Sequence, residues 1–181
     1  MRKIILYSAA SIDNFIAKKD GNIEWLHSPE YITPGEDYGY KDFYNSVDTT
    51  LMGNKTFKII NGFDMPFPYP DKKNYVFSSQ RQVTGNNHVT FVNDDIENFV
   101  SSLKETEGKD IWLVGGGQIN AYFLDHGLID QMILTVIPVV LGSGIPLFGK
   151  ANVETGFSLD HSKIFGNKCI QLFFSKSDQK G

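Results

Sequence analysis

The stretch Ile111-Trp112-Leu113-Val114-Gly115-Gly116-Gly117-Gln118 leads from an apolar run through three consecutive glycines into a second ordered segment. Ile111–Val114 is short and wholly apolar, which predicts a buried strand. Gln118 to His126 is predicted to be a helix that ends at Gly127, the residue type that commonly follows a helix C-terminus. The sequence therefore predicts a strand, a glycine turn and a helix in immediate succession, which is the repeating unit of α/β folds.

The same alternation recurs along the chain. Further strands are predicted at Lys3–Ala10, Thr49–Met52, Asn74–Ser78, His88–Val92 and Met132–Val136, and further helices at Asp37–Ser46, Asn54–Ile60 and from Asp94 onward.

Two local patterns add detail to this alternation. Asp94 is expected to cap the third of these helices, with Glu97 completing a capping box. Leu159–Phe165 and Lys168–Ser175 flank Gly166-Asn167, which is typical of an antiparallel hairpin. The whole pattern predicts a three-layer α/β sandwich, with a mostly parallel twisted sheet and an antiparallel hairpin at its C-terminal edge.

The composition excludes several classes of protein. The 181 residues are 41% hydrophobic and 21% charged, as in an ordinary globular chain, and we expect residues 1–181 to form a single domain. The net charge is −4, whereas proteins that bind nucleic acid usually have an excess of positive charge, so the composition gives no indication of a nucleic-acid partner. Cys169 is the one cysteine and the four histidines lack metal-ligand spacing, so neither a disulfide framework nor a metal site is expected.

The N-terminus has a basic start followed by an apolar run, as a signal peptide does. The run stops at Ser11, and Asp13 follows soon after, so a buried first strand is the favoured interpretation. No apolar stretch approaches the roughly 20 residues that a membrane-spanning helix needs. We therefore expect a cytoplasmic protein without a membrane partner.

Three predicted strand ends carry groups suited to phosphate. Gly115 to Gln118 opens a helix, and backbone N–H groups at such a position bind anions. Gly53-Asn54-Lys55-Thr56 repeats the arrangement, and Ser78-Ser79-Gln80-Arg81 adds hydroxyls and a cation. Each glycine turn alone is equally compatible with a simple tight turn. Because the carboxyl ends of parallel strands share one sheet edge, the three together predict a long site for a phosphate-bearing cofactor.

Five segments form a recognisable series along the chain: Ala9–Ala17 leading to Trp25, Met52–Thr56, Phe77–Gln80, Val114–Gly117 and Ile137–Phe148. In this order they resemble the dihydrofolate reductase superfamily, and the last of them resembles the branch that contains the reductase domain of riboflavin biosynthesis. Each is weak evidence alone, but five in order are strong. The chain is most similar to stand-alone bacterial reductase-like proteins of that branch.

The resemblance implies NADPH as cofactor, with NADH not excluded. It places Ala9, Ile16 and Ala17 at the nicotinamide, and it places Gly53, Asn54, Lys55 and Thr56 at the pyrophosphate and ribose. It assigns the adenosine end to Ser78, Ser79 and Arg81, and the pyrophosphate cradle to Val114, Gly115, Gly116, Gly117, Gln118 and Ile119. It also implies a cis peptide between Gly115 and Gly116.

The chain departs from the family pattern at several positions. Asn54 and Gln118 stand where the family usually has arginines, so Lys55 or Arg81 would have to meet the 2′-phosphate of NADPH. Lys72 falls near the arginine that holds the tail of folate, and lysine lacks that bidentate grip. Val114 replaces the glutamate that is usual in the riboflavin branch.

Glu30, five residues past Trp25, matches the carboxylate that binds the pterin in folate reductases. In that role it is the candidate catalytic residue, which supports protonation of the substrate before hydride transfer. Because it follows Pro29 in a polar stretch, a surface glutamate is an equally good interpretation.

Two functional hypotheses follow. The first is a nicotinamide-dependent reductase that acts on a small heterocycle, either folate-like or like the 5-amino-6-(5-phosphoribosylamino)uracil of riboflavin biosynthesis. The second is a non-catalytic nucleotide- or ligand-binding protein that retains the fold. The resemblance further implies a homodimer, with the apolar Ile133–Val140 region either at its interface or in a core strand.

Overall fold

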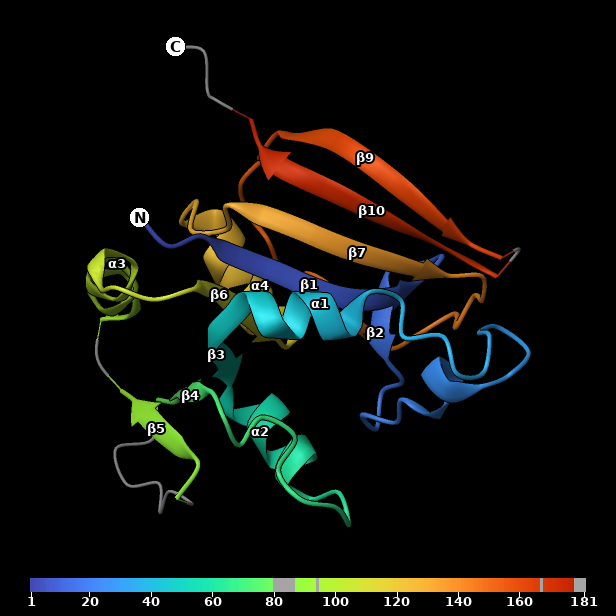
Figure 1. The fold of residues 1–181 in the computed structure, drawn as a ribbon, viewed down its shortest axis with the longest axis horizontal. Helices are drawn as coiled ribbons and strands as arrows, with labels where there is room; N and C mark the ends of the chain where they lie inside the picture. Colours follow the sequence, from blue (N-terminus) through green and yellow to red (C-terminus); the bar gives the residue numbers. More distant parts are fainter. Residues whose placement is uncertain (80–86, 94, 167, 178–181) are drawn as a thin grey trace.

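The computed structural model describes residues 1–79, 87–93, 95–166 and 168–177. Its elements in chain order are β1 (Ile4–Ser11), β2 (Phe15–Ala17), the 3-10 helix η1 (Glu24–His27), α1 (Tyr40–Ser46), β3 (Val47–Gly53), α2 (Asn54–Asn61), β4 (Lys73–Phe77), β5 (Val89–Val92), α3 (Ile96–Glu105), β6 (Asp110–Gly115), α4 (Gly117–Asp125), β7 (Gln131–Ile137), β8 (Ile145–Pro146), β9 (Phe157–Phe165) and β10 (Cys169–Lys176) (Figure 1).

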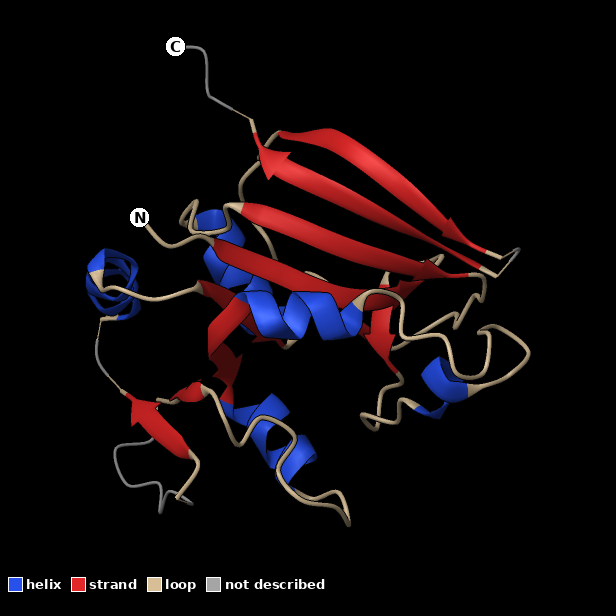
Figure 2. Ribbon diagram, in the orientation of Figure 1, coloured by secondary structure: helices blue, strands red, loops and turns tan. Residues whose placement is uncertain are grey.

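The main sheet has eight strands in the order β5-β4-β3-β6-β1-β7-β10-β9. The pairings from β5 to β7 are parallel, and β10 pairs antiparallel with both β7 and β9. β2 and β8 form a separate antiparallel pair. The predicted mostly parallel sheet with an antiparallel C-terminal hairpin is therefore confirmed (Figure 2).

Alternate residues of β1 belong to two different cores, which makes the sheet the middle of three layers. Ile4 and Leu6 pack in the core that holds residues of α3 and α4. Ile5 packs in the core that holds Phe43 of α1 and Phe57 of α2. Because successive side chains of a strand point to opposite faces, this alternation shows helices covering both faces. The expected three-layer arrangement is confirmed.

Some predicted boundaries are wrong, and each error has a local cause. The first predicted helix, 37–46, begins only at Tyr40, because Tyr38 and Gly39 take positive φ values of 54° and 76° and form a turn instead. Asp95 rather than Asp94 caps α3, accepting hydrogen bonds from the backbone N–H groups of Glu97 and Asn98. Asp94 itself lies outside the described residues.

Residues 133–137 of the apolar 133–140 region lie in the strand β7, whereas Val140 beyond it is exposed. β7 lies between β1 and β10, so its backbone is paired on both sides and offers no free edge. The homodimer that the resemblance implies stays a prediction. Within the described residues, none of the helices is both long and apolar enough to cross a bilayer.

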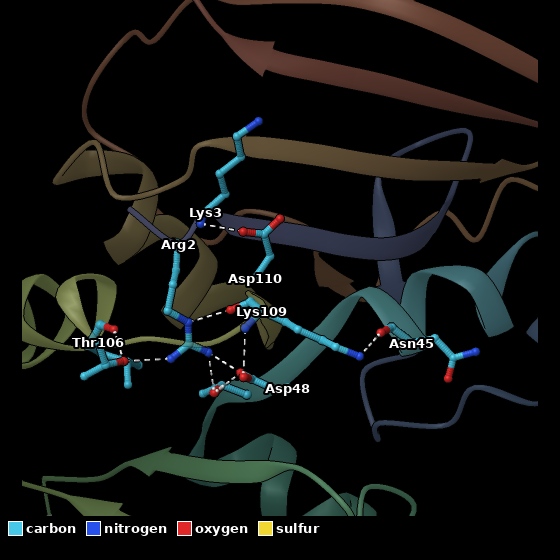
Figure 3. A network of polar contacts seen from close by, with 9 residues as sticks. Arg2, Lys3, Asn45, Asp48, Thr106, Lys109 and Asp110 are labelled. Atoms are coloured by element: carbon cyan, nitrogen blue, oxygen red, sulfur yellow. Dashed lines mark hydrogen bonds and ion pairs between the residues drawn. The ribbon is translucent and has the colours of Figure 1, made fainter.

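A buried arginine joins three strands at their amino ends (Figure 3). The Arg2 side chain is almost fully buried and donates hydrogen bonds to Asp48, to the hydroxyls of Thr49 and Thr106, and to the carbonyl of Lys109. Burial alone would raise the pKa of Asp48, but the Thr49 hydroxyl, the Lys109 amide and the Arg2 charge hold it below its ordinary value. The guanidinium thus donates to four acceptors at this edge and places a cation beside the Asp48 carboxylate.

We expect Arg2→Met to lower the free energy of unfolding by about 3 kcal/mol, because it leaves a partly buried carboxylate without its cation. Urea denaturation at neutral pH measures this. Lys3→Met is the matched control and should change the stability by less than about 0.5 kcal/mol, since the Lys3 side chain is exposed.

The same variant has a pH signature. A carboxyl whose pKa is lowered on folding contributes stability above its unfolded pKa of about 3.9, and this contribution is lost as the pH falls through the lower folded value. The acid loss of stability should therefore be smaller in Arg2→Met than in the parent chain. If both chains lost the same free energy of unfolding between pH 5 and pH 2, Arg2 would not lower the pKa of Asp48.

Candidate active site

The carboxyl ends of β3, β4 and β6 bring three of the predicted phosphate-binding segments together. β3 ends at Gly53, which lies opposite Phe77 of β4 in the parallel register. A side chain at Gly53 would contact Ile119 of α4 and the carbonyl of Gly115. The Thr56 hydroxyl of α2 donates a hydrogen bond of 3.0 Å to that same carbonyl. The segments that are far apart in sequence therefore meet at one edge, as the parallel topology predicted.

The glycine turn itself leaves no space for side chains. Gly115 and Gly116 have φ values of 93° and 100°, a region that side chains other than glycine rarely adopt. A methyl group on Gly115 would overlap the amide of Asn120, and one on Gly116 would overlap the Thr56 hydroxyl. The expected cis peptide between the two glycines is wrong: the bond is trans, and the two positive φ values make the turn instead.

Two helices begin at this edge without a side-chain cap. α2 has Gly53 as its N-cap and α4 has Gly116, and neither helix start has a side-chain hydrogen bond. Of the helices that start elsewhere, α3 is capped by Asp95, whereas α1 also lacks a side-chain cap. The first N–H groups of a helix need partners, and an anion is a good one. The two uncapped starts can therefore hold a diphosphate group, which fits the cofactor that the sequence predicts.

The residues predicted for the adenosine end lie beside α2. Asn54 donates a weak hydrogen bond of 3.4 Å from Nδ2 to the Ser78 hydroxyl, while its Oδ1 is buried without a hydrogen-bond partner. Lys55 and Ser79 are exposed. Arg81 lies outside the described residues. Among the described residues, Lys55 is thus the cation that sits at the start of α2.

The predicted nicotinamide residues lie on β1 and β2. Ala9 is half-buried near the end of β1, and Ile16 and Ala17 belong to β2, which pairs with β8. Gly144, just before β8, packs so closely on the carbonyl of Ala17 that a side chain there would overlap it. The glycine-rich 141–149 segment therefore contacts β2, which the sequence did not predict as a strand.

The 141–149 segment is also bonded to the glycine turn. The Asn120 amide donates a hydrogen bond of 2.8 Å to the Leu147 carbonyl, and the Gly149 amide donates one of 2.8 Å to the Gly117 carbonyl. Nothing in the spacing of Asn120 identified this role, because it depends on a contact across 27 residues. The segment thus links β2 to the start of α4.

Asp13 holds the loop between β1 and β2 against the same segment. Its carboxylate accepts hydrogen bonds from the Ser11 hydroxyl (2.6 Å) and from the amides of Leu141 (3.1 Å) and Gly142 (2.7 Å). The hydrogen bond from Ser11 is the largest cause that lowers the pKa of Asp13, and the two amides add to it. Asp13 therefore stays ionised at neutral pH and keeps the β1–β2 loop in one place.

Glu30 lies apart from the glycine turn, on an exposed loop. Its backbone carbonyl accepts a hydrogen bond of 2.8 Å from Nζ of Lys168, at the tip of the C-terminal hairpin. Desolvation, followed by the charge of Glu30 and a hydrogen bond with it, raises the pKa of Tyr31. The structure therefore places this carboxylate beside a tyrosine, next to the hairpin.

Trp25 connects this loop to the β1 end of the site. It is buried in a small core with Ile137 and Cys169, and Ala9 packs against that core. The indole Nε1 of Trp25 is buried and has no hydrogen-bond partner. Cys169 is buried and packs as a small side chain in this core.

The amino end of the sheet has a separate cavity of about 670 Å³, lined in part by Lys3, Asp130 and Lys176. The Asp130 carboxylate is already paired with Lys104 and with the Ile4 amide. Among the described residues, no group of three or more His, Cys, Asp or Glu side chains is arranged to hold a metal ion. We take the carboxyl edge as the candidate active site because the predicted phosphate-binding segments meet there.

A substitution pair separates the crowding of the glycine turn from its backbone strain. Gly115→Ala combines a positive φ with overlap on Asn120, whereas Gly142→Ala has a positive φ of 72° and nothing within 4 Å. We expect a loss of unfolding free energy of about 1 kcal/mol for Gly142→Ala and of at least about 2 kcal/mol for Gly115→Ala. Chemical denaturation measures both, and equal losses would mean that crowding contributes nothing.

Comparisons with known proteins agree with this fold. Residues 2–171 match the family model described as the RibD C-terminal domain. The uncharacterized protein YwjB of Bacillus subtilis (strain 168) is 43% identical over 177 residues, which cover 97% of this chain and 99% of YwjB.

Two solved structures share the architecture. A protein from Shewanella sp. PV-4, assigned to riboflavin biosynthesis, superposes with a TM-score of 0.87 at 28% identity, covering 97% of this chain and 99% of that one. The diaminohydroxyphosphoribosylaminopyrimidine deaminase/5-amino-6-(5-phosphoribosylamino)uracil reductase of Thermotoga maritima superposes with a TM-score of 0.73 at 17% identity, covering 97% of this chain and 57% of that one. The second likeness is one of fold alone. On the family match, the chain belongs to the RibD C-terminal domain family, the branch of the dihydrofolate reductase superfamily that its motifs resemble.

Proposed function

We propose that this chain is a nicotinamide-dependent reductase, with NADPH as the expected cofactor, that acts on a pterin- or pyrimidine-like heterocycle. The observation that carries the proposal is the meeting of two uncapped helix starts, those of α2 and α4, across a glycine turn. Family membership supports the same conclusion, since the resemblance implies a reductase. When bound, the cofactor would supply a hydride for a C=N or C=O bond of the substrate.

The residues at the carboxyl edge would bind and orient that cofactor. The N–H groups at the starts of α2 and α4 would hold the pyrophosphate, and Gly115 and Gly116 would let it approach the backbone. Ala9, Ile16 and Ala17 would form an apolar wall for the nicotinamide. Most of the catalysis would then come from positioning the two reactants.

Glu30 is the proposed proton donor or relay for the heterocycle. It lies on the exposed segment between η1 and α1, not on the elements that would hold the cofactor, so it would face the substrate. Tyr31, whose pKa is raised chiefly by desolvation and then by Glu30, stays neutral and can donate a hydrogen bond to the carboxylate. The pair would position a proton without needing a metal ligand.

Thermal unfolding with and without nucleotide tests the cofactor assignment. A nucleotide present at 100 times its dissociation constant stabilises the folded state by about 2.7 kcal/mol, which raises the midpoint by several degrees. We expect such a shift with NADPH. An equal shift with NADPH and NADH would mean that the protein does not recognise the 2′-phosphate. No shift with either nucleotide would contradict the proposed function.

Lys55→Met tests which residue meets the 2′-phosphate. Because Asn54 and Gln118 carry no charge, we expect the loss of the Lys55 cation to weaken NADPH binding about tenfold and to leave NADH binding unchanged. Fluorescence titration of both nucleotides measures this. Lys58→Met, a change of the same type further along α2, should leave both affinities unchanged. An unaltered NADPH affinity in Lys55→Met would remove Lys55 from the site.

Glu30→Gln tests the catalytic assignment. If Glu30 supports protonation, kcat should fall about 100-fold while nucleotide affinity stays constant. Steady-state turnover with dihydropterin and ribosylaminopyrimidine substrates provides the assay. Glu24→Gln, at an exposed glutamate of η1, is the control for loss of charge alone. Unchanged turnover in Glu30→Gln would remove that residue from the mechanism.

A non-catalytic ligand-binding protein with the same fold is the second candidate. The observation that favours it is the pair Asn54 and Gln118, which replace the two cations usual in the family. It predicts nucleotide binding without turnover of any heterocycle. The thermal and kinetic measurements together separate it from the reductase.

A further inference from the structure

The loop from residue 28 to residue 39, called here the 28–39 loop, joins η1 to α1 and carries Glu30. Within it, the amides of Tyr31 and Ile32 both donate to the Ser28 carbonyl, at 3.0 and 3.1 Å. Glu30 is exposed, and its amide makes a hydrogen bond of 3.3 Å with the Ser28 hydroxyl. These bonds shape a local turn, but they do not fix its position relative to the sheet.

Two contacts attach this turn to the sheet: the Tyr31 and Ile32 side chains pack against the small core of Ile137 and Cys169, and one lysine of the C-terminal hairpin bonds to its backbone. Lys168, immediately before β10, is partly buried, and its Nζ lies 2.8 Å from the Glu30 carbonyl and 3.4 Å from the Pro29 carbonyl. Both acceptors are backbone atoms, so the ammonium fixes the position of the backbone of the turn and does not depend on any side chain there. Hydrogen bonds from a charged donor are about twice as strong as neutral ones.

A buried glutamine holds the other end of the loop. Gln171 of β10 is 2% exposed, and its Nε2 donates to the Thr135 hydroxyl of β7 (3.0 Å) and to the Tyr38 carbonyl (3.2 Å). The Tyr38 ring packs edge-on against Phe165 of β9, with centroids 5.0 Å apart. Tyr38 also has a positive φ of 54°, which costs energy outside glycine and needs contacts to maintain it.

We infer that the C-terminal hairpin is the positioning element of the substrate loop: Lys168 sets the place of Glu30, and Gln171 sets the start of α1. The inference rests on the proposed function in so far as the 28–39 loop contacts substrate. It makes Lys168 a positioning residue, since its ammonium contacts backbone carbonyls and no reacting group. The hairpin would then control the affinity for substrate, whereas the carboxyl edge of the sheet would control the affinity for cofactor.

The chain offers a matched control on the same strand. Lys176, at the far end of β10, also donates from Nζ to a backbone carbonyl, that of Gly127, at 2.7 Å. Lys168→Met and Lys176→Met therefore remove the same kind of bond from opposite ends of one strand. Lys168→Arg keeps a cation with several donors and should restore the contact with the two carbonyls.

Amide hydrogen exchange of the purified full chain tests the attachment directly. The Tyr31 and Ile32 amides are the reporters, because both are hydrogen-bonded within the loop. We expect exchange at these amides to be at least about fivefold faster in Lys168→Met, unchanged in Lys176→Met and close to wild type in Lys168→Arg. Equal exchange in all variants, or a rise in Lys176→Met as large as in Lys168→Met, would overturn the inference.

Binding and turnover test the functional half. Lys168→Met should raise KM for the heterocycle about tenfold, with a smaller change in kcat and no change in the nucleotide dissociation constant. A loosened loop with an unaltered KM would overturn the claim that the hairpin positions a substrate loop. Failure of the wild-type chain to bind nucleotide would refute the proposed function instead, and the exchange result would still decide whether Lys168 holds the loop.

Discussion

Close backbone approach at the glycine turn is the constraint on which the rest of the site depends. Gly115 and Gly116 place their Cα atoms where a side chain would overlap Asn120 and Thr56, and Gly117 contacts the backbone of the 141–149 segment. Without side-chain volume at these positions, α2, α4 and the 141–149 segment can converge on one edge. The helices α2 and α4 then begin at this edge without side-chain caps, and such helix starts are suited to a diphosphate.

The two ends of the parallel sheet have different physical roles. At the amino end, Arg2 satisfies several acceptors, and Lys104 pairs with Asp130, so the polar groups there are bound to one another. At the carboxyl end, polar groups are left available: Asn54 Oδ1 is buried without a partner, and α2 and α4 lack side-chain caps. Paired groups stabilise the fold, whereas unpaired ones can be satisfied by a ligand, so stability and binding are separated along the strands.

Much of this arrangement was predictable because local patterns report local structure. Apolar runs identified β1, β3, β4, β5, β6 and β7, and turn residues identified the C-terminal hairpin. The N-cap of α3 was predicted wrongly because two neighbouring residues suit that position. Asp95 caps the helix, although Asp94 fits the capping pattern equally well. The short strands β2 and β8 were missed, since two or three residues carry too little periodicity and their pairing depends on contact with each other.

By itself the sequence determined the order of the α-helices and of the strands of the main sheet, the glycine turns at their ends and the resemblance to a reductase family. Each of these depends on residue spacing and motifs over short stretches of chain. Only the tertiary structure decided what those residues touch. It joined Asn120 to the Leu147 carbonyl and Gln171 to the Tyr38 carbonyl, and it set Glu30 against Lys168 across 138 positions. Such contacts pair side chains with backbone carbonyls, which every residue carries, so no residue type at the accepting position reveals them in advance.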